Sequence, residues 1–293
     1  MTRVAAIDLG TNSTRLLVAD VEDGRVGEVV RRSVVTRLGE GVDARRRLLP
    51  APVARVRNVL SQYRREAESL GAGRTLAVAT SAVRDAENGE AFLGEIEWSY
   101  GFATRLLSGD EEAALTLRGV GALGAGTLVL DVGGGSTELI TEGFRTSVDV
   151  GSVRLTERFL HGDPPDPAEL GTAAGQVRAL LPEVEVRRAV GVAGTVAQLH
   201  ALVGELSLAA VEAELEHLAA LPLAERRRVP KLDPERAPVI VAGALIVREV
   251  LRRYGLERLD YSVRDLLDGA ALEAAELPEE AERDAPPGAY TCC

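Results

Sequence analysis

Two short glycine-containing turns, each beginning two residues after an aspartate, are the segments of this chain best suited to phosphate chemistry. The first turn, Gly10-Thr11-Asn12-Ser13, follows Asp8, and the second, Gly133-Gly134-Gly135-Ser136, follows Asp131. Backbone N–H groups in such a turn converge on one point and bind an anion without needing a lysine. Placed face to face across a cleft, the two turns would hold a phosphate from both sides.

The two turns belong to a longer internal repeat. Residues 7–16 and 130–139 both read apolar-Asp-apolar-Gly-x-x-Ser-Thr-x-Leu. One such turn alone is more often an ordinary hairpin, but the paired copies favour a duplicated site. The repeat predicts two similar domains, 1–122 and 123–293, joined by the glycine-rich stretch 119–126, which is suited to a hinge. The tail from about residue 276 is expected to fray or to pack back on the first domain.

Carboxylates beside the turns could hold a divalent cation. Asp8 and Asp131 each stand just before a turn, where they could bind a metal between phosphates directly or through water. Glu138, on the strand that follows the second turn, would point to the same place. We therefore expect Mg²⁺ or another divalent cation at this site.

Strands and helices in alternation must position these residues. Apolar runs bounded by turn signals predict strands, and amphipathic stretches between them predict helices. The expected strands cover residues 4–9, 13–20, 25–36, 74–80, 104–107, 145–150, 188–192 and 258–262. A long apolar helix is expected over 236–254. This alternation predicts an α/β fold with a mixed sheet.

Composition excludes several function classes. The only cysteines, Cys292 and Cys293, are adjacent in the sequence, which rules out a disulfide framework and a cysteine-ligated metal site and suggests an inert tail. The single lysine, Lys231, stands in Pro-Lys-Leu, so the chain has neither the Walker A loop of P-loop NTPases nor the strand lysine of protein kinases.

Charge and hydropathy argue against two classes of binding partner, nucleic acids and membranes. The chain carries 45 acidic against 34 basic residues, a formal charge of −11, which argues against nucleic acid as a partner. Arginine runs at 45–47 and 226–228 could extend a channel for a polyanion, but solvated faces are the favoured interpretation. Without a long apolar run or a signal-peptide pattern, we expect no membrane partner and a cytoplasmic location.

The paired turns resemble those of the superfamily of actin, sugar kinases and heat-shock ATPases. Within it, nearly the whole chain resembles the exopolyphosphatase and guanosine pentaphosphate phosphatase (Ppx/GppA) family, in a short two-domain form. The stretches that carry the resemblance include AAIDLGTNSTRLLVAD, TRLGEGVD, AVATSAVRDAEN, LLSGDEEA, LVLDVGGGSTEL and GVAGTVAQL. SGDEEA together with DVGGGSTE is specific, because kinases of the superfamily lack the first motif. The resemblance implies two similar actin-like (ribonuclease H-like) α/β domains with mixed sheets and a cleft between them.

The resemblance also implies individual roles. Glu112 in SGDEEA matches the family's catalytic residue, which positions or deprotonates the attacking water, and Arg84 matches an arginine that faces the phosphates. Asp131 and Glu138 match ligands of magnesium and water. The positions that match phosphate-contacting loops are Asn12, Ser13, Gly134, Gly135, Ser136, Thr137, Gly194 and Thr195.

Glu112 and Arg84 each have an ordinary structural interpretation as well. A glutamate in the first turn of a helix is favoured by the helix dipole, although Glu111 fits that role better because it follows Ser108 by three residues. Arg84 could be a surface residue that caps the next helix. The segment Arg236-Ala237-Pro238 departs from the family's usual Arg-Ala-Asp, so what the far end of the cleft binds stays open.

The function expected from the sequence is removal of the terminal phosphate from inorganic polyphosphate. Hydrolysis of guanosine pentaphosphate to tetraphosphate is the near alternative, since it needs the same chemistry and a guanosine pocket. An ATP-dependent kinase and a non-catalytic sensor of polyphosphate or an alarmone are alternatives of other classes. The family resemblance also allows a homodimer.

Overall fold

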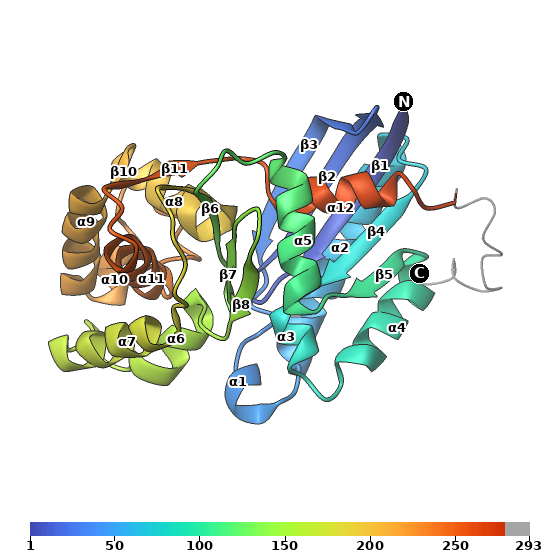
Figure 1. Cartoon of the computed structure of the whole chain (residues 1–293). Helices are drawn as coiled ribbons and strands as arrows, with labels where there is room; N and C mark the ends of the chain where they lie inside the picture. The colour runs from blue at the N-terminus through green and yellow to red at the C-terminus, as the bar shows by residue number, and fades with distance from the viewer. Residues whose placement is uncertain (279–293) are drawn as a thin grey trace. The chain divides into compact units, whose positions relative to one another are not determined.

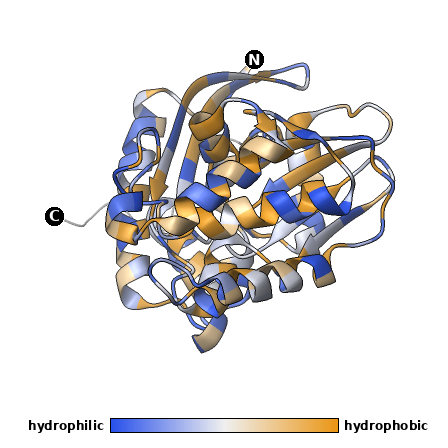
Figure 2. Cartoon of the chain, turned by 90° about the vertical axis from the view of Figure 1, so that its left-hand side faces the viewer, coloured by the Kyte–Doolittle hydropathy of each residue, from blue (hydrophilic) through white to orange (hydrophobic). Residues whose placement is uncertain are grey.

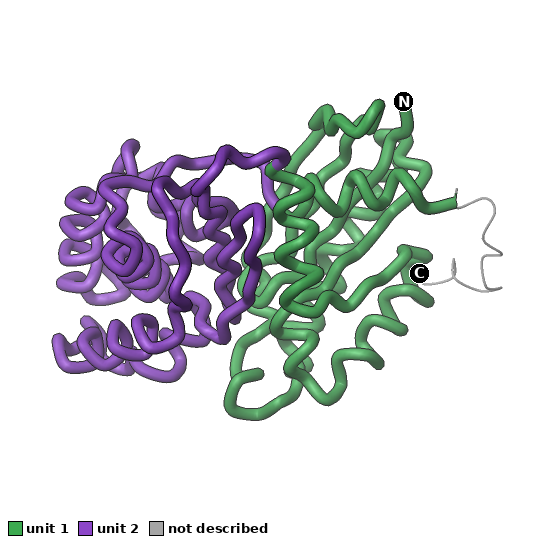
Figure 3. Tube along the Cα trace, viewed as in Figure 1, with its two compact units in different colours: residues 1–120, 266–293 green, residues 121–265 purple. Residues whose placement is uncertain are grey.

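The computed structural model describes residues 1–278, so the expectations for the Cys292-Cys293 tail lie outside the described residues. The chain forms two compact units (Figure 3). Of the described residues, unit 1 contains 1–120 and 266–278, and unit 2 contains 121–265. The chain passes from unit 1 to unit 2 after residue 120 and returns to unit 1 at residue 266.

Unit 1 is built on a five-stranded mixed sheet with strand order β3-β2-β1-β4-β5 (Figure 1). Strands β1, β2 and β3 pair antiparallel, whereas β1, β4 and β5 run parallel. The strands are β1 (Thr2–Leu9), β2 (Ser13–Glu22), β3 (Arg25–Val35), β4 (Thr75–Ala79) and β5 (Ala103–Leu106).

Helices cover both faces of this sheet. Alternate residues of β1 enter different hydrophobic clusters: Ala5 and Ile7 pack with α2 and α4, and Val4 and Ala6 pack with α5 and α12. Burial on both faces explains why β1 is apolar along its length. The helices are α1 (Val42–Arg45), α2 (Pro50–Ser69), α3 (Ser81–Arg84), α4 (Gly89–Tyr100), α5 (Gly109–Val120) and α12 (Leu266–Ala274).

Unit 2 repeats the same pattern on a six-stranded sheet of order β10-β11-β9-β6-β7-β8. Strands β6, β7 and β8 are antiparallel, and β6, β9 and β11 are parallel, as in unit 1. The strands are β6 (Thr127–Val132), β7 (Thr137–Ile140), β8 (Arg145–Val148), β9 (Arg188–Val192), β10 (Leu206–Ser207) and β11 (Arg258–Tyr261). The predicted α/β class with mixed sheets and a repeated domain is confirmed.

The core of unit 2 is organised by α11, which is buried over most of its length. This helix begins at Ile240 and not at Arg236, because Pro238 has no N–H and disfavours helical geometry before it. The helices are α6 (Ser152–Phe159), α7 (Pro167–Leu180), α8 (Ala193–Val203), α9 (Leu208–Ala220), α10 (Leu223–Arg226) and α11 (Ile240–Arg253). Coloured by hydropathy, helices of the chain carry both apolar and polar residues, as amphipathic covers of a sheet should (Figure 2).

One arginine of the 226–228 run has a structural role. Arg226 is buried and donates hydrogen bonds to the backbone carbonyls of Leu218, Leu221 and Ala237. Burial lowers the pKa of its guanidinium. Arg226 therefore ties the end of α9 to the segment before α11, and it is not a free cation for a polyanion channel. Among the described residues, no helix is both long and apolar enough to cross a membrane.

Helix α12 belongs to the core of unit 1. Its apolar residues, among them Leu266, Leu267 and Ala270, are buried in the cluster that also holds Leu115 of α5. The sequence after β11 therefore returns to the first sheet, because this apolar helix completes a core that α5 alone leaves uncovered.

The contact between α12 and α5 depends on Gly269. A Cβ at this position would lie 1.9 Å from the carbonyl oxygen of Leu115, which is backbone and cannot give way. We expect Gly269→Ala to reduce the free energy of unfolding by about 1–3 kcal/mol, because overpacking outweighs the helix propensity of alanine. Gly94→Ala, in the middle of α4 with nothing near its Cβ, should instead stabilise by up to about 1 kcal/mol. Urea denaturation of both variants tests this pair, and equal effects would contradict it.

Candidate functional site

In unit 1 the predicted residues lie at one edge of the sheet, outside the carboxyl ends of its parallel strands. Asp8, near the end of β1, is level with Val78 of β4, and Ala79 of β4 is level with Leu106 of β5. The segments that follow β4 and β5 carry Arg84 and Glu112. Ligands of open α/β sheets bind at this edge.

Glu112 and Arg84 form an ion pair. Arg84 Nη1 lies 3.3 Å from Glu112 Oε2 and donates a second hydrogen bond, of 2.7 Å, to the carbonyl oxygen of Leu107. Glu112 is only 7% exposed although it stands in the first turn of α5. Glu112 thus stands in the first helical turn, as its ordinary structural interpretation has it, and in addition is buried and paired with Arg84. The pair fixes a carboxylate at the edge where water would have to be activated.

Glu111, by contrast, fits the ordinary interpretation. Its carboxylate accepts hydrogen bonds from the backbone N–H and the hydroxyl of Ser108, each 2.8 Å long, and Glu111 N–H donates to Ser108 Oγ. Arg105 forms an ion pair with the same carboxylate, with Arg105 Nη2 lying 2.6 Å from Glu111 Oε1. The spacing predicted this capping box, which begins α5 and so positions Glu112.

The hydrogen bonds to Glu111 give the stability of α5 a pH dependence. The Ser108 backbone N–H, followed by Arg105, lowers the pKa of the Glu111 carboxyl from 4.5 to about 2. Because the pKa is lower in the folded state, the stabilisation is complete above pH 4.5 and is lost as the pH falls through about 2. We expect Glu111→Ala to have a lower free energy of unfolding than wild type at pH 7. This difference in the free energy of unfolding should become smaller as the pH falls from 4.5 to about 2. Urea denaturation across this range measures it, and a constant difference would contradict the charge-based explanation.

The turn between β1 and β2 is held by the segment that follows β3. Gly10 N–H donates to Ser13 O at 3.1 Å, while Thr36 and Arg37 donate their N–H groups to Asn12 O and Gly39 donates to Thr11 O. These bonds occupy the carbonyls of the turn. Within the described part of the chain, no acceptor faces the N–H groups of Thr11 and Asn12, which leaves them for an anion.

Asp8 is neutralised in its own unit. It is directly opposite Arg15 on β2, and Arg15 Nε lies 2.8 Å from Asp8 Oδ2 with both side chains largely buried. An ion pair of this kind weakens the case for Asp8 as a metal ligand, because the arginine already balances its charge. Arg15, which follows Thr14 in the repeat, is not among the site residues predicted from the sequence.

In unit 2 the equivalent pair consists of two carboxylates. Asp131 on β6 is directly opposite Glu138 on β7, at the position that Arg15 occupies in the repeat. Glu138 is fully buried and accepts a 2.7 Å hydrogen bond from Ser147 Oγ. Directly opposed residues have Cβ atoms about 5 Å apart, so this pair concentrates negative charge that a cation would stabilise.

The triple-glycine turn is oriented by the start of α6. Gly133 O accepts from Ser152 N–H, Gly134 O accepts from the next two N–H groups of the helix, and Arg154 Nε donates to Gly135 O at 2.7 Å. Gly151 permits this approach, since a Cβ there would lie 2.5 Å from the Gly134 backbone. No described residue accepts from the N–H groups of Gly134, Gly135 and Ser136. The turn therefore presents donors on the side away from α6.

The side chain of Thr137 is used within the fold, unlike the backbone N–H groups of the turn before it. Its side chain is fully buried and its hydroxyl donates to Val150 O at 2.5 Å. This hydroxyl ties β7 to the segment before α6, so it supports the turn and does not offer a hydroxyl donor to phosphate.

Gly194 and Thr195 open α8 directly after β9, whose Val192 is level with Asp131. Ala193 has a φ of 61°, a strained conformation for a residue with a side chain, and such strain is frequent at functional sites. The guanidinium of Arg236 lies over Gly194, since a Cβ built on Gly194 would be 2.5 Å from Arg236 Nη1. The sequence shows that the segment 236–238 departs from the family pattern. Only the structure shows that Arg236 contacts Gly194.

Within unit 2, then, Asp131, Glu138, the triple-glycine turn and the start of α8 share one edge of the sheet. Within unit 1, Asp8, the first turn, Arg84 and Glu112 share the corresponding edge. Among the described residues, no group of three or more His, Cys, Asp or Glu side chains could hold a metal ion. A cation bound by Asp131 and Glu138 would therefore need further ligands from a substrate or water.

The duplicated mixed sheets define an α/β protein with two actin-like domains. The family model of the Ppx/GppA phosphatase family matches residues 17–276, and the chain belongs to this family.

Named relatives and solved structures agree with this assignment. The chain is 39% identical to exopolyphosphatase 2 of Mycobacterium tuberculosis, over 94% of this chain and 99% of the relative. A crystal structure of an exopolyphosphatase-like protein superposes with a TM-score of 0.87 and 32% identity, covering 93% of this chain and 97% of the other. The structure of the PPX-GPPA enzyme of Aquifex aeolicus superposes with a TM-score of 0.76 and 28% sequence identity, covering 93% of this chain and 99% of the other.

Proposed function

We propose that this chain is an exopolyphosphatase, which hydrolyses the terminal phosphate of inorganic polyphosphate. The observation that carries the proposal is the ion pair of half-buried Arg84 with buried Glu112 at the carboxyl edge of the first sheet. A carboxylate held at this edge suits the activation of a water molecule as nucleophile. The naming of the Mycobacterium tuberculosis relative supports the same substrate.

In the proposed reaction Glu112 orients a water molecule and accepts its proton. The water oxygen forms a bond to the terminal phosphorus, the phosphoanhydride bond breaks, and the electron pair leaves on the bridging oxygen of a chain shortened by one phosphate. The N–H groups of Gly134, Gly135 and Ser136 bind phosphate oxygens, and Arg84 both positions Glu112 and balances negative charge. Positioning and electrostatics supply most of the acceleration in such a reaction.

A divalent cation fits the residues of unit 2. Asp131 and Glu138 would hold it, and Mg²⁺ is bound in this way by one or two carboxylates together with substrate phosphates. When bound, the ion would neutralise charge on the phosphates. Asp8 is a weaker candidate because it is paired with Arg15.

The test compares phosphate release from long-chain polyphosphate and from guanosine pentaphosphate, each with magnesium and with EDTA. Faster metal-dependent release from polyphosphate supports the proposal. Faster release from guanosine pentaphosphate would assign the alternative substrate. No release from either, with or without an added acceptor and ATP, would replace the hydrolase by a binding protein.

A further inference from the structure

Glu138, one of the two carboxylates at the carboxyl edge of unit 2, has a polar neighbour on each side in the sheet. Strand β7, which carries Glu138, lies between β6 and the edge strand β8. Asp131 of β6 and Ser147 of β8 are both directly opposite Glu138. Residues that are directly opposite in neighbouring strands point to the same face of the sheet. The three side chains therefore form one row, with Glu138 in the middle.

This row lies on the face of the sheet away from the main core of unit 2. Side chains of successive strand residues alternate between the two faces. Leu139, the residue after Glu138, and Leu130 on β6 belong to the hydrophobic cluster that contains α11. Thr146, the residue before Ser147, is level with Leu139. Ser147 therefore shares the face of the carboxylates, and Thr146 does not.

Ser147 donates a hydrogen bond that orients the Glu138 carboxylate. Its Oγ lies 2.7 Å from Glu138 Oε1. An ionised carboxylate has no proton to give, so the serine hydroxyl is the donor. Glu138 is fully buried, so bulk water does not replace this donor. The hydroxyl of Ser147 therefore holds Oε1 on the side of β8.

The internal repeat supplies a comparison within the same chain. In unit 1 Asp8 is directly opposite Arg15, and Arg15 is directly opposite Ser33 of β3. The serine recurs at the equivalent position, but its neighbour is a guanidinium that pairs with Asp8 at 2.8 Å. Ser33 is exposed, and the residue opposite it is not a carboxylate. Only in unit 2, then, does the serine of the row stand beside an acidic pair.

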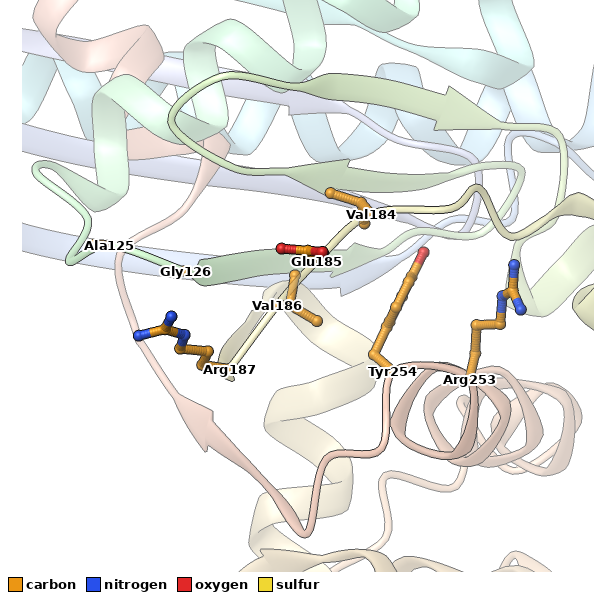
Figure 4. A pocket seen from close by; sticks show the side chains of 8 residues that line it. All are labelled: Ala125, Gly126, Val184, Glu185, Val186, Arg187, Arg253 and Tyr254. Atoms are coloured by element: carbon orange, nitrogen blue, oxygen red, sulfur yellow. The ribbon is translucent and has the colours of Figure 1, made fainter.

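Converging side chains distinguish this row from the pocket at the other end of the sheet (Figure 4). That pocket, of about 540 Å³, includes Gly126, which directly precedes β6. Since β6 has six residues, the pocket is about 20 Å from the glycine-rich turn. Arg187 and Arg253 lie on opposite sides of Tyr254 and point away from one another (Figure 4). Their charges do not meet at one ligand, whereas the row brings two carboxylates and their donor together.

We propose that Ser147 is a positioning residue for the divalent cation of the proposed site. By holding Glu138 Oε1 on the side of β8, its hydroxyl turns Oε2 to the side of Asp131, where both carboxylates bind one ion. A neutral hydroxyl does this without cancelling the negative charge that attracts the ion, as Arg15 cancels that of Asp8. Carboxylates that bind metals are themselves held by hydrogen bonds of this kind. The inference rests on the proposed cation site and does not depend on which phosphate substrate is hydrolysed.

Binding of Mn²⁺ to the full chain tests the proposal without requiring turnover. Mn²⁺ takes the same oxygen ligands as Mg²⁺, and the electron paramagnetic resonance signal of the free ion gives its Kd. Ser147→Ala should raise this Kd about 10–100-fold, the usual cost of removing a hydrogen-bond partner of a metal ligand. Ser147→Thr keeps the hydroxyl and should bind close to wild type. Ser33→Ala, the same change at the equivalent position of unit 1, is the matched control and should leave the Kd unchanged.

Phosphate release gives a second readout. In Ser147→Ala the magnesium concentration for half-maximal release should rise by a similar factor, because the ion binds more weakly. At saturating magnesium kcat should be close to that of wild type, since Ser147 does not touch the reacting atoms. A serine that only supported the strand would lower the thermal midpoint and leave the magnesium requirement unchanged.

Three results would overturn the inference. If wild type does not bind Mn²⁺, Ser147 has no ion on which to act. If Ser147→Ala binds Mn²⁺ with the Kd of wild type, the serine is only a structural residue of β8. If Ser147→Thr or Ser33→Ala loses as much affinity as Ser147→Ala, the loss comes from packing and not from the hydroxyl. Mn²⁺ binding as expected, without hydrolysis of polyphosphate or guanosine pentaphosphate, would support the role of Ser147 and refute the proposed function.

Discussion

Glutamine in place of Glu112 is expected to lower kcat for phosphate release from polyphosphate by about 10²–10⁴-fold. The amide has nearly the shape of the carboxylate but cannot accept the proton of the attacking water. Because the substitution leaves the proposed phosphate donors of the triple-glycine turn unchanged, KM should change little. Steady-state phosphate release at saturating polyphosphate and magnesium measures the effect.

Glu111→Gln is the matched control, because it makes the same chemical change at the neighbouring residue of the same helix turn. Glu111 contacts Ser108 and Arg105 and serves to begin α5, so this variant should keep most of its kcat. A Glu112→Gln enzyme with wild-type kcat would remove Glu112 from the chemistry. Equal losses in both variants would indicate that the helix start, and not a particular carboxylate, is what activity requires.

The contact of Arg84 with Glu112 gives the pair a second readout. Arg84→Gln should lower kcat as well, because it removes the hydrogen bond that positions the Glu112 carboxylate. A rise in KM with unchanged kcat would restrict Arg84 to binding substrate charge.

Much of the fold was predictable because its signals are local. Turns such as Asp23-Gly24 and apolar runs such as Val4–Leu9 place strands directly, and the repeat around Asp8 and Asp131 predicts that both sheets share one topology. The return of α12 to unit 1 was not predictable in this way. Its apolar residues show that it is buried, but which core it enters depends on the gap beside Leu115.

The site was predictable to the extent that a residue type determines its role. Glycine-rich turns followed by strands must present backbone donors, and the structure adds the contacts with α6 that direct them. The partner of a charged side chain depends on strand register, which the sequence does not state. The pairing of Asp8 with Arg15, and the position of Arg236 over Gly194, therefore appear only in the structure.

The repeat gives rise to the second large prediction, which concerns Asp8 and Asp131. Both are largely buried at the end of a central strand, but Asp8 faces Arg15 whereas Asp131 faces Glu138. Asp131→Asn should raise the magnesium concentration for half-maximal activity and lower kcat by about 10²-fold or more, because it removes one of the two carboxylates available to the ion. Glu138→Gln should move the magnesium requirement in the same direction.

Asp8→Asn should behave differently, although the change in the side chain is identical. It leaves the largely buried guanidinium of Arg15 without its carboxylate, and breaking a buried pair in this way destabilises by about 3–5 kcal/mol. We therefore expect a lower thermal midpoint with a magnesium requirement close to that of wild type. Magnesium titrations and thermal unfolding of both variants separate the two roles. If Asp8→Asn raised the magnesium requirement as much as Asp131→Asn, the ion pair with Arg15 would have to open for metal binding, and both aspartates would be ligands.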